Sequence, residues 1–441
     1  MRDGVLGQLP RGIKGRLGWG AGIALAVLAG CSAEETDRAG GPADAGADGD
    51  ATNVDGAVDA GLKSQRPPPD WASADFIDVH THCELMSDCA GARCCDTSGL
   101  ASLEGLYSAR AVLLSNEYWL INEDIYPAEA VNYFTGLNET ARDTAAKEPE
   151  AVGFFAGLRC LYQRKVDESW AEACKAEARD WARQGAIGFK DHIGKQYETG
   201  EAEGGMFIGG WNRFNGFCVV PQGSLTPNSS CMQQSTVHYL ALEPAWREVV
   251  RYIVAELRLP IVSHAASYQG ATTTCYDPEL GAIDNCALVT RRHQQSLATW
   301  LSNEVDSAAR RRFIVAHMGF LTGEPAGLVA LLDTGVSVDT SRLDAFAAAG
   351  CQARSLFAAY PQQILFGTDR RVSQTCLPAS YSAWMHILRG PADQAQSFDT
   401  CQGTIDARGL ELGTPQVAGC PDVPSDALTR VLKQNFLELY E

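Results

Sequence analysis

Eight short apolar segments are spread along residues 71–441, and amphipathic stretches separate most of them. The segments are Phe76–His82, Ala109–Leu114, Val152–Leu158, Ala186–Lys190, Pro260–His264, Phe313–His317, Val336–Thr340 and Gln363–Asp369. Between them, Asp167–Gln184 and Glu243–Leu257 repeat apolar residues at helical spacing, and Leu428–Leu437 predicts a closing helix. Parallel strands need such crossover connections, so the alternation predicts repeated β–α units. Eight units predict a closed (β/α)8 TIM barrel in the α/β class.

The first thirty residues carry an export signal. Four basic residues precede an apolar run from about Trp19 to Gly30, which is too short to span a membrane. The run ends in Leu28-Ala29-Gly30-Cys31, which resembles the bacterial lipobox and makes Cys31 the lipidated N-terminus of the mature chain. An ordinary export signal with a coincidental cysteine is the alternative. The residue after that cysteine is Ser32 and not an aspartate. By the usual sorting rule for Gram-negative lipoproteins, this predicts an outer-membrane lipoprotein that faces the periplasm or the cell surface.

Residues 31–70 are rich in Ala, Gly and Asp and hold hardly any large apolar residue before the domain. Such a segment cannot bury enough surface to offset its ordering entropy, which predicts a disordered tether between signal and domain. The domain itself is expected over residues 71–441. The formal net charge of −18 makes the chain a poor partner for nucleic acid, whose phosphates require Lys and Arg. The charge says nothing about which substrate the protein takes; a small molecule is the expected substrate, and the membrane is the expected partner of the lipid anchor.

Polar residues end four of the predicted strands. His80 and His82 end the first, and two residues apart on a strand they project to the same side. His264, His317 and Asp369 end three later strands. In barrels of this kind the active site collects at the C-terminal ends of the strands. These residue types at those positions predict a metal site at the barrel mouth, against the alternative of four unrelated polar strand ends.

The order of these residues resembles the amidohydrolase superfamily, and their flanks resemble its amidohydrolase-2 branch. That branch includes hydrolases as well as decarboxylases of aromatic and unsaturated acids. The resemblance runs from about Ala74 to the end of the chain, although Phe436 replaces a small residue common in the branch. The stretches that carry it are Phe76–His82, 185–190, 259–264, 336–341, Ile364–Asp369 and 432–437.

The resemblance implies that His80, His82, His264 and Asp369 bind one divalent metal. Zinc is expected, because imidazole and carboxylate ligands with an open position suit a catalytic zinc. Such a metal lowers the pKa of its bound water to about 7. By the same resemblance, Asp369 takes the proton from the attacking water, and His317 polarises the carbonyl or holds the oxyanion.

Three further residues are candidates with less defined roles. Some superfamily members carboxylate a lysine on the fourth strand to bridge two metals, which would make Lys190 a ligand. The sequence Lys190-Asp191-His192 instead fits the amidohydrolase-2 pattern without bridging, so a single metal is expected. His192 and Arg370, which follows Asp369, are candidate substrate contacts, and an Arg in the pocket would favour decarboxylation.

The fifteen cysteines leave an even number once Cys31 is set aside. In an exported protein this favours disulfides, although some cysteines could be free core residues. Most lie after predicted strands, so bridges would brace long loops on the catalytic face. Short loops predict the pairs Cys218–Cys231 and Cys275–Cys286. A cysteine zinc site among residues 83–95 is the competing interpretation.

These observations predict a hydrolase that uses a metal-activated water to cleave a C–O or C–N bond of a small substrate. The alternative within enzymes is a metal-dependent, non-oxidative decarboxylase, because the same ligand set supports it in this branch. A non-catalytic surface lipoprotein that keeps the barrel for binding is the other class. Loss of ligands would signal that class, and the sequence retains all of them.

Overall fold

The computed structural model describes the chain from Arg66 onward, with gaps. The described residues are 66–83, 85–86, 94–103, 105–115, 136–158, 160, 168–191, 211–212, 217–221, 244–264, 273–277, 281–283, 286–321, 325–341, 351–373, 377–389 and 420–441. The predicted signal, the tether up to residue 65 and the lipidation site Cys31 lie outside them. Among the described helices, none combines the length and apolar character that a membrane span requires.

Nine parallel strand elements, which belong to eight stretches of the described chain, form the centre of the domain. In the order of the sheet, the elements are β14 (Ile364–Leu365), β13 (Ser337–Asp339), β12 (Phe313–Val315), β9 (Ile261–Ser263), β6 (Gly188–Asp191), β5 (Val152–Gly157), β4 (Ala109–Leu114), β1 (Phe76–His82) and β15 (Arg370–Arg371). Each lies within or directly beside one of the eight apolar segments predicted from the sequence.

The two outermost elements of this order belong to one stretch of chain. β14 pairs with β13, and β15, five residues further on, pairs with β1. Between them the Val79 amide donates to the Phe366 carbonyl at 2.9 Å, and the Asp369 amide donates to the His80 carbonyl at 2.8 Å. The eighth strand therefore joins both edges of the sheet and closes the barrel, which confirms the predicted (β/α)8 fold.

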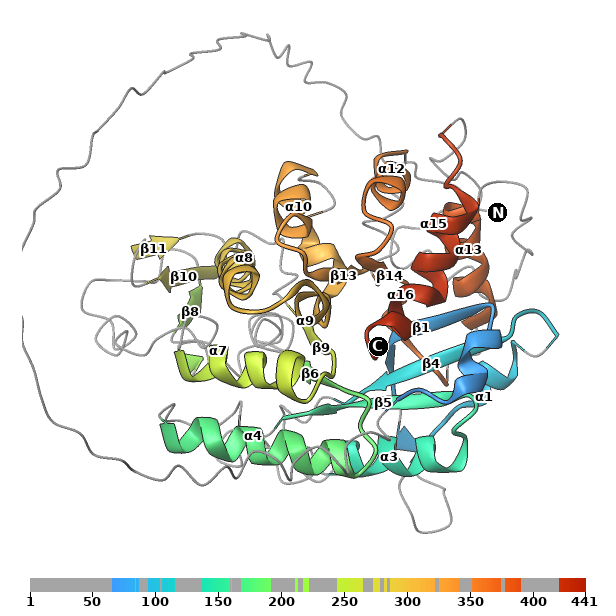
Figure 1. Cartoon of the computed structure of the whole chain (residues 1–441), viewed down its shortest axis with the longest axis horizontal. Coiled ribbons are helices and arrows are strands. Elements are labelled where there is room, and N and C mark those ends of the chain that lie inside the picture. The colour runs from blue at the N-terminus through green and yellow to red at the C-terminus, as the bar shows by residue number, and fades with distance from the viewer. Residues whose placement is uncertain are drawn as a thin grey trace, which may run out of the picture. The chain divides into compact units, whose positions relative to one another are not determined.

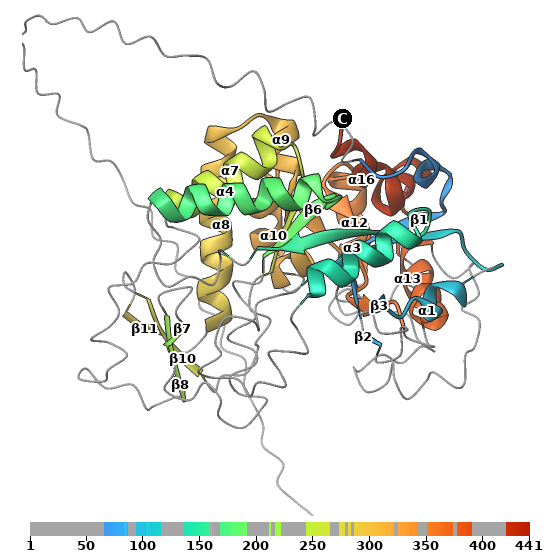
Figure 2. The same cartoon turned by 90° about the horizontal axis from the view of Figure 1, so that it is seen from below.

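Helices connect the strands and cover them from outside (Figures 1 and 2). The longer ones are α3 (Leu137–Lys147), α4 (Glu168–Arg183), α7 (Pro244–Arg251), which continues as a π-helical segment over Tyr252–Glu256, α8 (Cys286–Glu304), α10 (Pro325–Leu332), α12 (Cys351–Ala359) and α13 (Leu377–Arg389). The shorter ones are the 3-10 segments Pro69–Ser73 and Ala316–Phe320, with α1 (Ser98–Ala101) and α9 (Ser307–Arg311). The closing helix runs through α15 (Ser425–Thr429), a π-helical segment over Arg430–Gln434 and α16 (Asn435–Glu438).

The core forms where the apolar stripes of the helices meet the outer face of the strands. On α4 the predicted stripe is buried at Trp170, Cys174 and Ala178. At the closing helix, the Asn435 side-chain amide donates to the carbonyls of Pro361 and Ile364, both at 2.8 Å. These bonds hold the C-terminal helix against the start of β14, so the last residues of the chain help to fix the strand that carries Asp369.

A second, antiparallel sheet is built from the connections after β6 and β9. β7 (Trp211–Asn212) and β8 (Phe217–Pro221) come from the first connection, and β10 (Thr273–Asp277) and β11 (Gly281–Ile283) from the second. β8 pairs with β10, so two loops of the catalytic face join in one small sheet.

Within the described part of the chain, three disulfides connect loops that follow barrel strands. Cys83–Cys95 follows β1 and reaches β3 (Cys94–Cys95), which pairs with β2 (Leu85–Met86); Cys160–Cys174 joins the loop after β5 to α4; Cys351–Cys420 joins the start of α12 to the segment before α15. Their Cα–Cα distances are 5.1, 5.2 and 4.9 Å. The prediction of disulfide-braced loops is confirmed. The predicted pairs Cys218–Cys231 and Cys275–Cys286 involve side chains outside the described ones and stay predictions.

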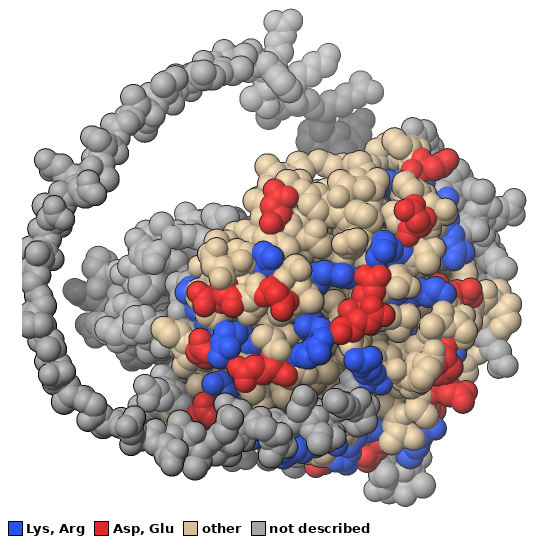
Figure 3. Space-filling view, in the orientation of Figure 1, with Lys and Arg blue, Asp and Glu red and all other residues tan. Residues whose placement is uncertain are grey.

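On the face shown in Figure 3, acidic and basic side chains are interspersed. Glu438 illustrates this mixture, since it forms ion pairs with both Arg311 and Arg430 at 3.1 and 2.9 Å. Such a surface differs from the continuous basic stripe that binding to nucleic acid phosphates needs.

Candidate metal centre

The two histidines of the first strand reach the barrel mouth through an irregularity in β1. The register with β4 shifts between Asp78 and Thr81, where β1 holds one extra residue. A bulge of this kind re-aims the side chains next to it. Asp78 accordingly contacts Tyr381 of the outer helix α13, whereas His80 faces residues of β13. Sequence alternation alone would have placed Asp78 and His80 on the same side.

Three of the predicted metal ligands converge. Ligand atoms of His80, His82 and Asp369 all lie within 4.8 Å of one another. The Nε2 atom of His82 is 2.9 Å from Oδ1 of Asp369, and Nε2 of His80 is 3.6 Å from the same oxygen. His80 is buried, but the side chains of His82 and Asp369 are 18% and 26% exposed. The group is therefore open to solvent and to a substrate on one side.

His264 lies at the same end of the barrel but outside this group of three. Its ring contacts that of His317 with centroids 4.6 Å apart, and His317 in turn contacts His80 at 4.8 Å. His317 therefore has a ring neighbour on each side, one from β9 and one from β1. The predicted fourth ligand is next to the site, although its ring nitrogens do not share the 4.8 Å cluster of the other three.

Two of the predicted site residues have backbone angles that side chains rarely adopt. Asp369 has a φ of 55°, and His317 has a φ of 55° with a ψ of 33°. This left-handed region is costly for residues other than Gly, by roughly 1–3 kcal/mol each. Such strain persists only where the surroundings enforce it, and it collects at functional sites. Among the described residues other than glycine, only Arg258 and Met318 also have a positive φ.

Asp339, a carboxylate at the end of the seventh strand, was not among the site residues predicted from the sequence. Oδ2 of Asp339 lies 2.8 Å from Nδ1 of His80, and both groups are buried. Ser341, two residues on, lies 2.6 Å from Nδ1 of His317 and 3.1 Å from Nδ1 of His80. Its hydroxyl also donates to Oδ1 of Asp339. The sequence did hold a signal for Asp339, because the polar residues Asp339-Thr340-Ser341 end an apolar strand. Polar strand ends of this kind had identified the other candidate ligands.

The neighbouring imidazoles and carboxylates set one another's charge. Burial alone raises the pKa of Asp369, but the hydrogen bond from His82 and the charges of His317 and His80 bring it well below its ordinary value. Burial lowers the pKa of His317 well below its ordinary value, with Lys190 adding to the lowering and Asp369 opposing it. At neutral pH the site therefore combines an ionised carboxylate with an uncharged imidazole.

Asp78 ties the two ligand-bearing strands together beneath the site. Its Oδ1 accepts hydrogen bonds from the amides of His80 and Thr368 at 3.0 and 3.1 Å. Its Oδ2 accepts from the Tyr381 hydroxyl at 2.8 Å and from the Thr368 hydroxyl. Burial raises the pKa of Asp78 to about 7, although hydrogen bonds from Thr368, His80 and Tyr381 act to lower it. Through Asp78 the residues preceding Asp369 are fixed relative to His80.

The other candidates are placed differently. Lys190 is buried on β6, and its charge acts on His317, which places it near the site. His192 lies outside the described residues. Arg370 is buried and pairs in register with Thr81, whose hydroxyl bonds to the neighbouring strand, so Arg370 does not share the face of His82. Arg371, which the sequence analysis did not consider, is exposed and pairs with His82.

The residues present fit a metal ion. The buried Nε2 atom of His80 makes no hydrogen bond within the described part of the chain, and it points at the Asp369 carboxylate from 3.6 Å. A buried polar atom without a partner is costly unless a ligand satisfies it. Two imidazoles and one carboxylate, with a third imidazole adjacent, are ligand types that hold catalytic divalent metal ions in proteins.

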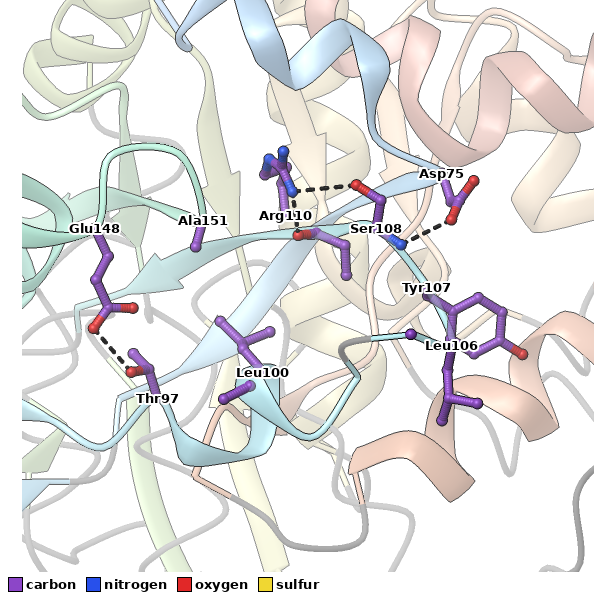
Figure 4. Close-up of a pocket in the computed structure, with 12 residues that line it drawn as sticks. Asp75, Thr97, Leu100, Leu106, Tyr107, Ser108, Arg110, Glu148 and Ala151 are labelled. Carbon is purple, nitrogen blue, oxygen red and sulfur yellow. Dashed lines mark hydrogen bonds between the residues drawn. The ribbon is translucent and has the colours of Figure 1, made fainter.

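A cavity of about 690 Å³ lies at the opposite end of the strands (Figure 4). It is lined by Asp75 just before β1 and by Ala151 just before β5. Several of its polar groups bond to one another: the Ser108 amide donates to Asp75 at 2.8 Å, and the Thr97 hydroxyl donates to Glu148 at 3.1 Å. That end of a barrel serves stability, so the cavity is separate from the candidate site.

No family model and no curated protein matches this sequence. Among solved structures, the fold is similar to a probable 2-pyrone-4,6-dicarboxylic acid hydrolase from Acinetobacter baumannii, at 13% identity, 76% and 99% coverage of the two chains and a TM-score of 0.39. It is similar to 2,6-dihydroxybenzoate decarboxylase from Rhizobium, at 14% identity, 72% and 94% coverage and a TM-score of 0.41. A lactonase from Listeria monocytogenes follows at 11%, with 83% and 94% coverage and a TM-score of 0.33.

The class of this protein rests on its strand order and on the geometry of its site. By those two observations the chain is a (β/α)8-barrel protein with a candidate metal centre at the C-terminal ends of its strands.

Proposed function

We propose that this protein is a metal-dependent hydrolase that cleaves a C–O or C–N bond of a small substrate. The observation that carries the proposal is the convergence of His80, His82 and Asp369 within 4.8 Å at the mouth of a closed barrel. One zinc ion is the proposed metal, held by these three residues and by His264 after its ring moves toward them. The metal would supply a bound water of lowered pKa.

The side chains of the site have separate tasks in this proposal. Asp369, held as a carboxylate by His82 and its neighbours, accepts the proton that the attacking water loses. His317 lies beside the ligands. With a proton on Nε2 it would donate to the carbonyl oxygen or the oxyanion of the substrate. Lys190 provides a buried positive charge at the same end of the barrel. Asp78 and the left-handed backbone at Asp369 keep the acceptor in place.

Decarboxylation of a carboxylic acid is the second candidate, and Arg371 is the observation that favours it. Arg371 is exposed at the mouth and pairs in register with His82, so it shares the side of the sheet on which His82 lies. A guanidinium there can hold a substrate carboxylate in bidentate fashion. Arg371→Ala should then raise KM for acidic substrates about tenfold or more and leave KM for neutral esters unchanged.

We also propose that the protein is an exported lipoprotein anchored through Cys31. The motive is the Leu28-Ala29-Gly30-Cys31 sequence at the end of a short apolar run. Mass spectrometry of the mature protein should find a lipidated cysteine as its first residue. An unmodified N-terminus beyond residue 32 would exclude this anchoring.

The proposed activity is tested by metal analysis of the purified protein together with a screen of esters, lactones, amides and carboxylic acids. About one equivalent of metal and chelator-sensitive turnover are expected. Asp369→Asn should reduce turnover far more than stability, and His317→Ala should keep most of the metal and lose activity. Asp333→Asn, an exposed carboxylate bonded to Tyr360, is the matched control and should change neither. Full turnover of both site variants after exhaustive chelation would refute the proposal.

A further inference from the structure

We propose that Asp339 and Ser341, at the end of the seventh strand, are positioning residues that fix the tautomers of His80 and His317. This inference rests on the proposed function for its catalytic meaning, but it concerns hydrogen positions that can be measured without activity or metal. Asp339 and Ser341 are 0% and 1% exposed, and His80 and His317 are 0% and 2% exposed. Bulk water therefore does not compete for these hydrogen bonds.

Asp339 fixes the tautomer of His80. Oδ1 of Asp339 receives the amides of His317 and Ser341 at 2.8 and 3.1 Å, together with the Ser341 hydroxyl. Three donors on one oxygen favour the carboxylate form, which can only accept. Oδ2 then requires a donor, and Nδ1 of His80 is 2.8 Å away. His80 is therefore protonated at Nδ1, and the lone pair on its Nε2 is directed toward Asp369.

The single hydrogen of the Ser341 hydroxyl fixes the tautomer of His317. A serine hydroxyl has one hydrogen, and that of Ser341 is used by Asp339. Ser341 can then only accept from Nδ1 of His317, which lies 2.6 Å away. A neutral His317 is therefore also protonated at Nδ1 and has its lone pair on Nε2. The role in polarising a carbonyl, which the resemblance implies, consequently requires His317 to take up a proton on Nε2 first.

One carboxylate thus orients two imidazoles with different tasks. A metal-binding histidine commonly donates its second ring N–H to a carboxylate, which fixes the ring and raises its basicity. Here the same carboxylate also fixes, through Ser341, the histidine that lies next to the ligands. Gly367 allows this close grouping, because a Cβ at that position would lie 2.9, 3.4 and 3.5 Å from the Cβ atoms of His80, Ser341 and Asp339.

The direct test is nitrogen NMR of the full-length, metal-free protein with labelled histidine. Long-range proton–nitrogen correlations distinguish the two tautomers, and His80→Gln and His317→Gln assign their signals among the eight histidines. Both residues should carry hydrogen on Nδ1 in the unsubstituted protein. Either residue protonated at Nε2 alone would overturn the inference.

Variants add a second readout. Asp339→Asn should lower zinc affinity about 10- to 100-fold and shift the tautomer signal of His80. Ser341→Ala should change the signal of His317 while zinc affinity stays within about threefold. Ser337→Ala is the matched control, since it removes a buried serine on the same strand whose hydroxyl bonds to the Arg311 carbonyl, and it should alter neither readout.

The outcomes separate this inference from the proposed function. A protein with both Nδ1-protonated tautomers that binds no metal would refute the proposed function and leave the positioning role intact. If the wild type binds zinc, and if a folded Asp339→Asn variant has the same zinc affinity and the same histidine signals as the wild type, the positioning role is refuted and the proposed function stays intact.

Discussion

Gly367 gives the sharpest test of how tightly the site is built. It lies between β14 and β15, where the eighth strand crosses from one edge of the sheet to the other. A Cβ added by Gly367→Ala would lie 2.9 Å from the Cβ of His80. Carbon atoms in contact are separated by about 3.5–4.0 Å, so the two strands must separate by about 0.6 Å or more. The contact is with a Cβ atom beside the backbone, which cannot rotate away.

Two consequences of different size follow. Overpacking of this kind in a core costs about 1–3 kcal/mol of unfolding free energy. Metal–ligand distances tolerate only about 0.2 Å, so a displacement of His80 by several tenths of an ångström removes it from the coordination geometry. We expect zinc affinity to fall at least about tenfold, which corresponds to about 1.4 kcal/mol. Zinc affinity is measured by competition with a chelator. The unfolding free energy is measured by denaturant unfolding in an excess of the same chelator, so that no zinc is bound.

Gly153→Ala is the matched control. Its Cβ would lie 2.5 Å from Cδ1 of Ile187 and 3.1 Å from Cη2 of Trp71, at the start of β5 and away from the metal centre. It should lose stability within the same range and keep zinc affinity. Normal affinity in Gly367→Ala, or an equal loss of affinity in Gly153→Ala, would refute the reasoning.

Three further predictions concern the loops, the closing helix and the metal. Replacing Cys83 and Cys95 together by Ser should lower the unfolding free energy by about 3 kcal/mol, because their disulfide closes a loop of 12 residues. The double variant should also bind zinc more weakly, because Cys83 directly follows the ligand His82. An unchanged midpoint of thermal unfolding would contradict the stability prediction. Burial alone raises the pKa of Glu438, but hydrogen bonds and the charges of Arg311 and Arg430 bring it below its ordinary value of 4.5. A folded-state pKa below the unfolded one stabilises the protein above pH 4.5, and this is lost as pH falls further. The unfolding free energy of the wild type should therefore exceed that of Glu438→Gln by about 1 kcal/mol at pH 7. This difference should disappear below pH 4.5, which urea unfolding at several pH values will measure. A difference that does not change with pH would contradict the prediction. Free zinc at 100 times its Kd should add about 2.7 kcal/mol to the unfolding free energy and a chelator should remove it, whereas an unshifted midpoint would mean that the folded state binds no zinc.

The sequence determined the strands and the residues that end them. Each apolar segment is a local signal, because a strand buried on both faces must be apolar along its length. The helices α4 and α7 were predicted within a few residues, since amphipathic spacing is local too. The histidines and Asp369 could be placed at one end of the fold because all strands of a parallel barrel end on the same side.

What only the tertiary structure decided are pairings between distant residues. The crossing of the eighth strand between β13 and β1, the bulge that separates Asp78 from His80, and the bond from Asp339 to His80 across 259 residues have no local signature. The disulfide between Cys351 and Cys420, 69 residues apart, is of the same kind. Local sequence sets which side of a strand a residue can occupy. Which residue it meets there depends on how the whole barrel closes, because that closure fixes the register of every pair of strands.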